Sequence, residues 1–107
     1  MKAINLFSDA AILAGESSPD ELLKKAGVGL INTILTDLKK PPISSLTDEI
    51  EFSRPTEYTA ISNGVAMLIC LYLGDDAGIA VMSELYINAK KRLLKNTGNI
   101  KNTVFGG

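Results

Sequence analysis

The sequence predicts an all-α protein, a small four-helix bundle with a long loop at residues 41–55 and an extended C-terminal tail. Two observations support this fold class. Apolar residues recur every three or four positions in four segments, and helix start and stop signals separate those segments. At 107 residues, 46% of them apolar, the chain is long enough for one modest core. We therefore expect a helical bundle domain at residues 1–95 and a flexible tail at residues 96–107.

Two helices are predicted in the N-terminal part of the chain. The first spans residues 3–14, ends at Gly15, and has one apolar stripe: Ala3, Leu6, Phe7, Ala10, Leu13 and Ala14. The second follows Ser18, which with Glu21 is typical of a capping box. Its expected buried residues are Leu23, Ala26, Leu30, Ile31, Ile34, Leu35 and Leu38. Gly27 and Gly29 lie inside this helix, either to allow the close approach of another helix or because they are simply tolerated.

The segment 41–55 shows neither a helical period nor a hairpin turn. It is nevertheless too apolar for a free linker, because it contains Ile43, Leu46, Ile50 and Phe52. Long loops in compact domains either carry function or pack against the body. We expect this loop to fold over the bundle or onto a neighbouring molecule.

The third and fourth helices form a predicted hairpin. The third begins at Pro55 and ends at Gly74, with an inner stripe of Tyr58, Ile61, Val65, Leu68 and Tyr72. Nine consecutive apolar residues from Val65 to Leu73 should be covered on all sides. Asp75 is expected to cap the fourth helix, which buries Ile79, Met82, Tyr86, Ala89 and Leu93. Further apolar residues exceed what one partner helix covers, so we expect a subunit interface at Tyr72, Val81, Leu85, Ile87 and Leu94.

Basic residues gather at the end of the fourth helix. They are Lys90, Lys91, Arg92 and Lys95, in a chain of net charge -1. Three interpretations stay open for this cluster: a solvated helix end, contact with a partner, or contact with DNA phosphates. The tail adds isolated apolar residues, which we also expect to contact a partner: Ile100, Val104 and Phe105.

The sequence contains no pattern of catalytic, cofactor-binding or metal-ligating residues. It has no histidine, and its one cysteine, Cys70, lies inside the apolar run, where a buried thiol is expected. Asp75 and Asp76 are better explained by a helix cap than by a cation site. The longest apolar run is about half of what a membrane span needs. We therefore expect neither an enzyme nor a cofactor nor a membrane protein.

Four segments, in this order, carry a family resemblance: INLFSDAAILAG, GLINTILTDL, SLTDEI, and GVAMLICLYLGDD with ELYINAKKRL. Together they resemble the small helical head-tail connector, or head-completion adaptor, proteins of tailed double-stranded DNA bacteriophages and prophages. The resemblance implies a ring-forming virion subunit, assembled in the bacterial host cytoplasm. Such a ring docks beneath the portal, meets tail-completion proteins and lets DNA pass without sequence-specific binding.

The resemblance also gives the loop and the tail a role. Members of this family are thought to engage the portal with their C-terminal segments, so we expect residues 96–107 to become ordered on contact with a partner. The alternative function is a small helical DNA-binding or regulatory module that uses the basic end at residues 90–95. That alternative needs a recognition helix with exposed base-reading residues, which no predicted helix displays.

Overall fold

The computed structural model describes the backbone of residues 1–16 and 18–106 and the side chains of residues 1–16 and 18–94. Within this part of the chain there are four helices: α1 (Ala3–Leu13), α2 (Glu21–Asp37), α3 (Pro55–Leu73) and α4 (Asp76–Gly106). Extended pairing in the described backbone is limited to an isolated antiparallel bridge between Lys2 and Glu49. The predicted all-α fold class is confirmed.

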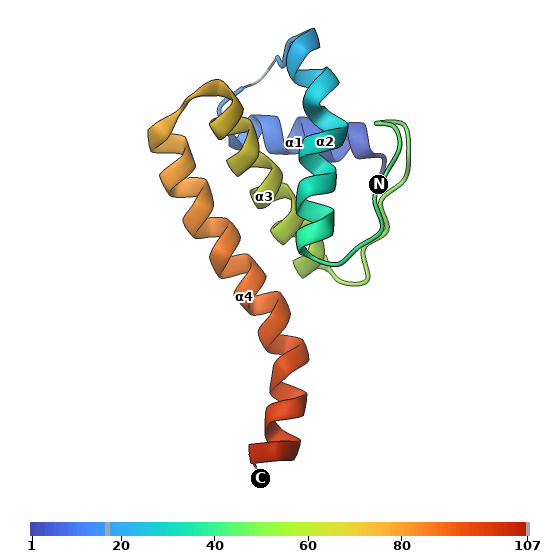
Figure 1. Cartoon of the computed structure of the whole chain (residues 1–107), viewed down its shortest axis with the longest axis vertical. Coiled ribbons are helices and arrows are strands. Elements are labelled where there is room, and N and C mark those ends of the chain that lie inside the picture. The colour runs from blue at the N-terminus through green and yellow to red at the C-terminus, as the bar shows by residue number, and fades with distance from the viewer. Residues whose placement is uncertain (17, 107) are drawn as a thin grey trace.

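The central element is α3, which contacts each of the other three helices. It lies between α4 on one side and the pair α1 and α2 on the other (Figure 1). The largest fully buried side chains come from α1, α2 and α3: Leu6, Phe7, Leu23, Ile31, Leu35, Ile61, Val65 and Ile69. The core is therefore built mainly by three helices, and α4 is added along α3 from outside.

Most of the helix-boundary signals in the sequence are confirmed. Gly15 and Gly74 adopt left-handed backbone conformations, with φ of 85° and 72°; Gly15 follows the C-cap residue of α1, and Gly74 is the C-cap of α3. Asp75 caps α4, since its Oδ1 accepts a hydrogen bond from the Gly78 backbone N–H at 3.0 Å. The boundary predicted at Ser18 is wrong. Asp20 is the N-cap of α2, and its carboxylate accepts from the Leu23 N–H at 2.8 Å.

The two glycines inside α2 have different explanations. A Cβ atom at Gly27 would lie 3.3 Å from Phe7 Cε1 and 3.4 Å from the Leu46 side chain. A Cβ atom at Gly29 would meet nothing within 4 Å. Close packing therefore accounts for Gly27, and tolerance at an exposed position accounts for Gly29.

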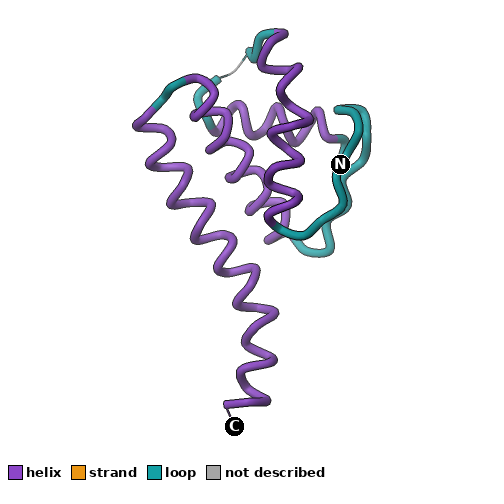
Figure 2. The backbone as a smooth tube through the Cα atoms, in the orientation of Figure 1, coloured by secondary structure: helices purple, strands orange, loops and turns teal. Residues whose placement is uncertain are grey.

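The loop between α2 and α3 folds over the bundle, one of the two arrangements that the sequence left open. It runs beside the N-terminus (Figure 2). Its carbonyls at Asp48 and Leu46 accept hydrogen bonds from the N–H groups of Ala3 and Ile4, each at 2.8 Å. These two donors have no partner within α1, so the loop completes the first turn of that helix.

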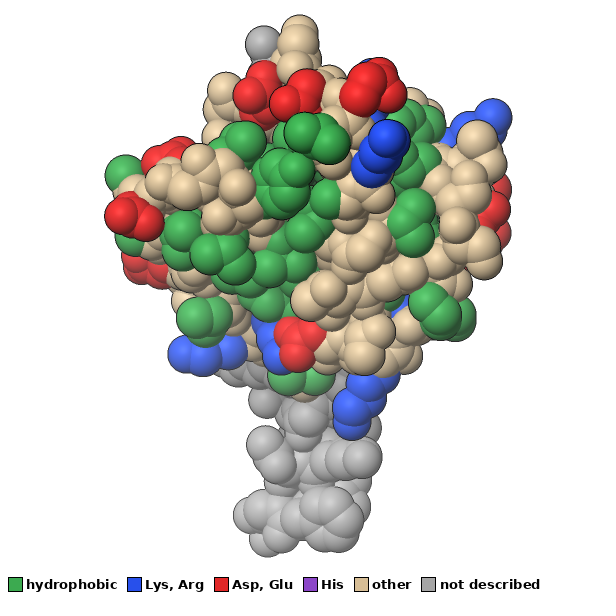
Figure 3. Space-filling model, turned by 45° about the horizontal axis from the view of Figure 1, so that its top comes forward, with side chains coloured by type: hydrophobic (Ala, Val, Ile, Leu, Met, Phe, Trp, Pro, Cys, Tyr) green, Lys and Arg blue, Asp and Glu red, His purple; other side chains and the backbone are tan. Residues whose placement is uncertain are grey.

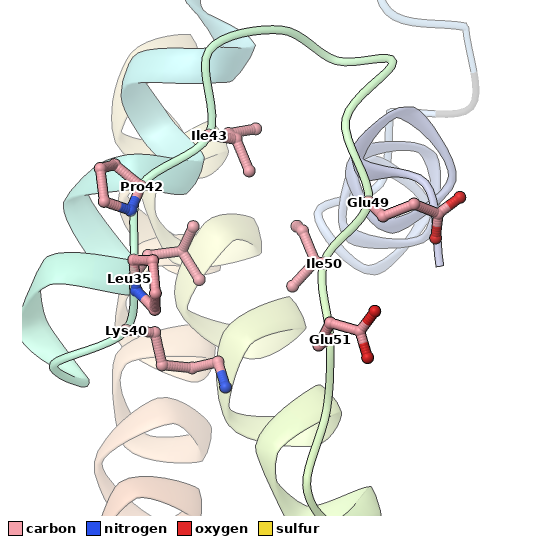
Figure 4. A pocket seen from close by; sticks show the side chains of 8 residues that line it. Leu35, Lys40, Pro42, Ile43, Glu49, Ile50 and Glu51 are labelled. Atoms are coloured by element: carbon pink, nitrogen blue, oxygen red, sulfur yellow. The ribbon is translucent and has the colours of Figure 1, made fainter.

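A second set of contacts ties the loop to α2. The Asn32 side chain donates to the Ile43 carbonyl at 2.9 Å and accepts from the Ile43 N–H at 2.8 Å. Figure 4 shows Leu35, Ile43 and Ile50 pointing toward one another across a small pocket, while Glu49 and Glu51 point away from it. Ile43 and Ile50 are both buried. The apolar residues of the loop thus belong to the core.

The last helix is longer than the sequence predicted. We expected helix to end near Lys95, whereas the α4 backbone is helical through Gly106. Asparagine, threonine and glycine in this stretch are weak helix formers, but no proline interrupts the hydrogen-bond ladder. The side chains of residues 95–107 lie outside the described part of the structure. The flexibility expected for residues 96–107 stays a prediction.

Candidate subunit interface

One stripe of α4 packs on α3. Met82, Tyr86, Ala89 and Leu93 are buried, as the sequence predicted, and Ile79 is half-buried. The helices approach closely, because a Cβ atom at Gly64 of α3 would lie 2.8 Å from Tyr86 Cε1.

Four large apolar side chains of α4 lie outside this stripe and are exposed to solvent. Val81 is 58% exposed, Leu85 44%, Ile87 49% and Leu94 56%. Successive residues turn by about 100° around a helix axis, so Leu85 and Ile87 point about 200° apart. We call Val81 and Leu85 the Val81 flank, and Ile87 and Leu94 the Ile87 flank. α4 therefore presents two opposite apolar flanks, and exposed apolar surface of this kind is typical of protein interfaces.

The Val81 flank borders the C-terminal end of α1. A cavity of about 330 Å³ lies between them, lined by Leu13, Gly78 and Val81 among others. Leu13, which the sequence placed in the core, is 49% exposed, and Ile12 is 65% exposed. The core prediction for Leu13 is wrong, because the buried face of α1 ends with Ala10 and Ala11. The apolar surface thus continues from α4 onto α1.

A second cavity, of about 290 Å³, lies between α1 and α3. Its lining includes Asp9, Ile12, Leu13 and Tyr58. The Tyr58 hydroxyl donates a hydrogen bond to Asp9 Oδ2 at 2.6 Å. This bond, together with burial, raises the pKa of Tyr58 to about 12, because ionised tyrosine would face a carboxylate. The cavity therefore combines apolar side chains with one acidic group and the hydroxyl-bearing side chains of Thr59 and Ser62.

The Ile87 flank borders the end of α2. Leu94, Leu38 and Lys90 contribute to a cavity of about 280 Å³ there. Lys90 Nζ donates to Asp37 Oδ2 at 2.7 Å, and the Tyr86 hydroxyl donates to the same oxygen. The bond from Lys90, with that from Tyr86, lowers the pKa of the Asp37 carboxyl. Burial, and then the bond to Asp37, raises the pKa of Tyr86. This network joins the last residue of α2 to α4.

The basic cluster is only partly available to a partner. Lys90 is held by Asp37 of its own chain, whereas Lys91 and Arg92 are exposed. The remaining residues of the predicted partner contact lie outside the described side chains: Lys95, Ile100, Val104 and Phe105. Lys91 and Arg92 are thus the described cations that project from α4 into solvent.

The apolar run in α3 is not covered along its whole length, so that expectation is wrong. Val65 and Cys70 are buried, but Leu71, Tyr72 and Leu73 are 60%, 48% and 45% exposed. Tyr72 is therefore a surface residue, and its predicted place in the inner stripe is wrong. Its exposure is what a role in a subunit interface requires. Figure 3 shows hydrophobic side chains gathered across the middle of one face of the molecule, with acidic side chains along its upper edge.

Some exposed apolar residues were missed by the sequence analysis. Leu71 and Leu73 are part of the apolar run, whose length was the available signal. Ile12 and Leu22, which are 65% and 66% exposed, stand alone in their helical patterns and gave no comparable signal. Helical periodicity identifies the buried stripe but not where the covering helices end.

The described residues offer little for catalysis or metal binding. Among them, no three side chains of the His, Cys, Asp and Glu types lie close enough to hold a metal ion. Burial, with the nearby charge of Asp75, raises the pKa of the Cys70 thiol, which disfavours the reactive thiolate. Nor does any described helix have the length and apolar character needed to cross a membrane.

Comparison of the chain with protein-family models, with curated proteins and with solved structures found no match.

Proposed function

We propose that this chain is a virion structural protein, a subunit of the head-tail connector ring of a tailed phage or prophage. The observation that carries the proposal is the pair of opposite apolar flanks on α4. A cyclic ring requires each subunit to present two different surfaces that meet head to tail. The Val81 flank lies beside α1 and the Ile87 flank beside α2, so the two surfaces have different surroundings.

Charge distribution supports contacts between unlike surfaces. Asp75 and Asp76 lie at the start of α4, whereas Lys91 and Arg92 are exposed farther along the same helix. Complementary charge favours one orientation of two copies and disfavours others. The sequence resemblance to connector proteins points to the same arrangement.

In this proposal the loop and the tail lie toward the axial partners, which are the portal and the tail-completion proteins. The loop is held to α1 and α2 by hydrogen bonds, so its shape is set before it meets a partner. In contrast, the α4 backbone continues beyond the bundle as far as Gly106 (Figure 1). DNA passes through the ring without sequence-specific contacts.

Light-scattering mass over a range of concentrations tests the proposal. The wild-type chain should grow to a mass that stops at one closed oligomer. Leu85→Lys and Ile87→Lys each place a charge on one flank and should each lower that mass. Leu22→Lys is the matched control, because Leu22 is 66% exposed on α2 and lies outside both flanks. A mass unchanged by both flank variants, or lowered equally by the control, contradicts the proposal.

A second candidate function is a small DNA-binding module, because the exposed cations Lys91 and Arg92 could contact phosphates. Binding through phosphates would weaken steeply with salt, and a regulator would also prefer one sequence. Fluorescence anisotropy with two unrelated DNA duplexes at several salt concentrations separates the two functions. Tight and sequence-selective binding favours the regulatory module over the ring subunit.

A further inference from the structure

The cavity between α1 and α3 contains a carboxylate, that of Asp9, which forms no ion pair with a cation among the described side chains. Asp9 Oδ2 accepts the bond from Tyr58, whereas no hydrogen bond from a described residue reaches Asp9 Oδ1. The ion pairs among the described residues involve other acidic groups. One oxygen of Asp9 is therefore available to a donor from outside the chain.

Apolar side chains lie beside this carboxylate, in a cavity that Thr59 and Ser62 also line. Ile12 and Leu13 are exposed beside it, and Leu13 also lines the cavity that reaches Val81. A ligand that covered only the apolar surface would bury the charge of Asp9 with the Tyr58 hydroxyl as its one described hydrogen-bond partner and no cation, at a cost in free energy. A ligand that fits this site should therefore carry a cation flanked by apolar groups.

The Ile87 flank of α4 has that composition. Ile87, Lys91 and Leu94 are spaced by four and three residues, so they share one face of the helix. All three are exposed, and Lys91 has no acidic partner among the described side chains. The stripe spans about 10 Å, or two helical turns, with the cation between its apolar ends.

We propose that the Ile87 flank of one copy docks against the α1–α3 cavity of a second copy, with Lys91 paired to Asp9. Ile87 and Leu94 then cover Ile12 and Leu13 of that second copy, next to its Val81 flank, because Leu13 lines both the α1–α3 cavity and the cavity that Val81 lines. The same chain cannot make this contact, because its own Ile87 flank borders α2, where Lys90 is bound to Asp37. Each copy retains one unused cavity and one unused stripe, so the contact repeats head to tail, as a ring requires. This inference rests on the proposed self-assembly and names the residues that meet.

Charge-reversed variants of the full chain test the pairing. Asp9→Lys alone and Lys91→Asp alone should each weaken association at least about tenfold, since like charges then face each other. An equimolar mixture of the two variants should restore association, because every cavity again meets an opposite charge. Light-scattering mass at matched concentrations reads both effects.

Arg92→Asp is the matched control for this experiment. Arg92 is the next residue along α4 and is also exposed, but it points about 100° away from Lys91. Alone, Arg92→Asp should associate as the wild type does, because it keeps both Asp9 and Lys91. Circular dichroism checks that the variants fold, and Asp9→Asn, which keeps the side-chain shape, provides a milder second variant with an effect in the same direction. Equal weakening of association by Arg92→Asp and Lys91→Asp, or wild-type association of both Lys91→Asp and Asp9→Asn, overturns the pairing.

Carbodiimide coupling separates failure of this pairing from failure of self-assembly. The reagent joins a carboxylate to an adjacent amine, and mixing ¹⁴N and ¹⁵N chains marks the links formed between copies. The expected product joins Asp9 of one copy to Lys91 of another. Links between copies at other positions alone overturn the pairing and leave self-assembly standing. A monomeric mass without any link between copies overturns both proposals.

Discussion

Replacing Gly64 by alanine measures how closely α3 and α4 must approach. The new Cβ atom would lie 2.8 Å from both Tyr86 Cε1 and Ile34 Cδ1. Carbon atoms pack favourably at about 3.5–4.0 Å, so the contacted groups must retreat by about 0.7 Å or more. The end of the Ile34 side chain can rotate, whereas the Tyr86 ring is tied to Asp37 through its hydroxyl. The substitution therefore pushes α4 away from α3 or strains this bond.

Gly29→Ala is the control that isolates the destabilisation caused by overpacking at Gly64. Alanine is favoured over glycine inside a helix by about 1 kcal/mol at either position. At Gly29 a Cβ atom meets nothing within 4 Å, so this gain should appear in full. At Gly64 the same gain is opposed by overpacking, which costs about 1–3 kcal/mol. The difference in unfolding free energy between the two variants should therefore be about 1–3 kcal/mol, with Gly64→Ala the less stable.

Urea unfolding followed by far-ultraviolet circular dichroism measures this difference. In a domain of this size, 1 kcal/mol corresponds to a shift of about 4–8 °C in Tm, so thermal unfolding provides a second readout. If Gly64→Ala proves as stable as Gly29→Ala, α3 and α4 do not pack as closely at Gly64 as described. The placement of the two flanks, which depends on this packing, would then be wrong as well.

Three further predictions concern local contacts. Asp20→Ala should lower the unfolding free energy by about 1 kcal/mol, because Asp20 is the N-cap of α2. Ser18→Ala should change it by less than about 0.5 kcal/mol. Equal losses of stability in urea unfolding would contradict this assignment of the cap. Tyr58 should ionise at a pH of about 12, well above its ordinary pKa of 10.0, and Asp9→Asn should lower that pKa. Because the pKa of Tyr58 is raised in the folded state, the bond between Tyr58 and Asp9 stabilises the fold below pH 10, and this stabilisation is lost as the pH rises toward 12. Tyrosinate absorbance follows the titration. An unchanged Tyr58 pKa in Asp9→Asn would rule out the bond between the two side chains. Asn32→Ala should lower the unfolding free energy by about 1–3 kcal/mol and speed amide hydrogen exchange in the loop, because two hydrogen bonds to the loop backbone are lost. Unchanged exchange would show that other contacts hold the loop.

Features that depend on neighbouring residues were predictable from the sequence. The end of α3 at Gly74 and the cap at Asp75 follow from residue types that few other positions tolerate. The buried stripe of α4 follows from helical period alone. The start of α2 was misplaced because Ser18 and Asp20 are both good caps, and the charged carboxylate is the stronger acceptor.

Features that depend on distant parts of the chain were not predictable. Leu13 and Tyr72 continue apolar stripes in the sequence, yet both lie beyond the point where a neighbouring helix covers them. The bonds from Ala3 and Ile4 to the loop join residues more than forty positions apart in the sequence. The Asp9–Tyr58 contact, which defines the acidic cavity, is likewise formed only by the crossing of α1 and α3.

Cross-linking between the two flanks of α4 tests most directly whether they meet in an assembly of identical copies. Val81→Cys and Ile87→Cys each place one thiol on one flank, while the native Cys70 is buried and 1% exposed. With a short bismaleimide, a mixture of the two variants should give dimers that join position 81 of one chain to position 87 of the other. Neither variant alone should form dimers, because like flanks do not meet in a head-to-tail ring. Efficient dimers from either variant alone, or none from the mixture, would contradict the proposed ring.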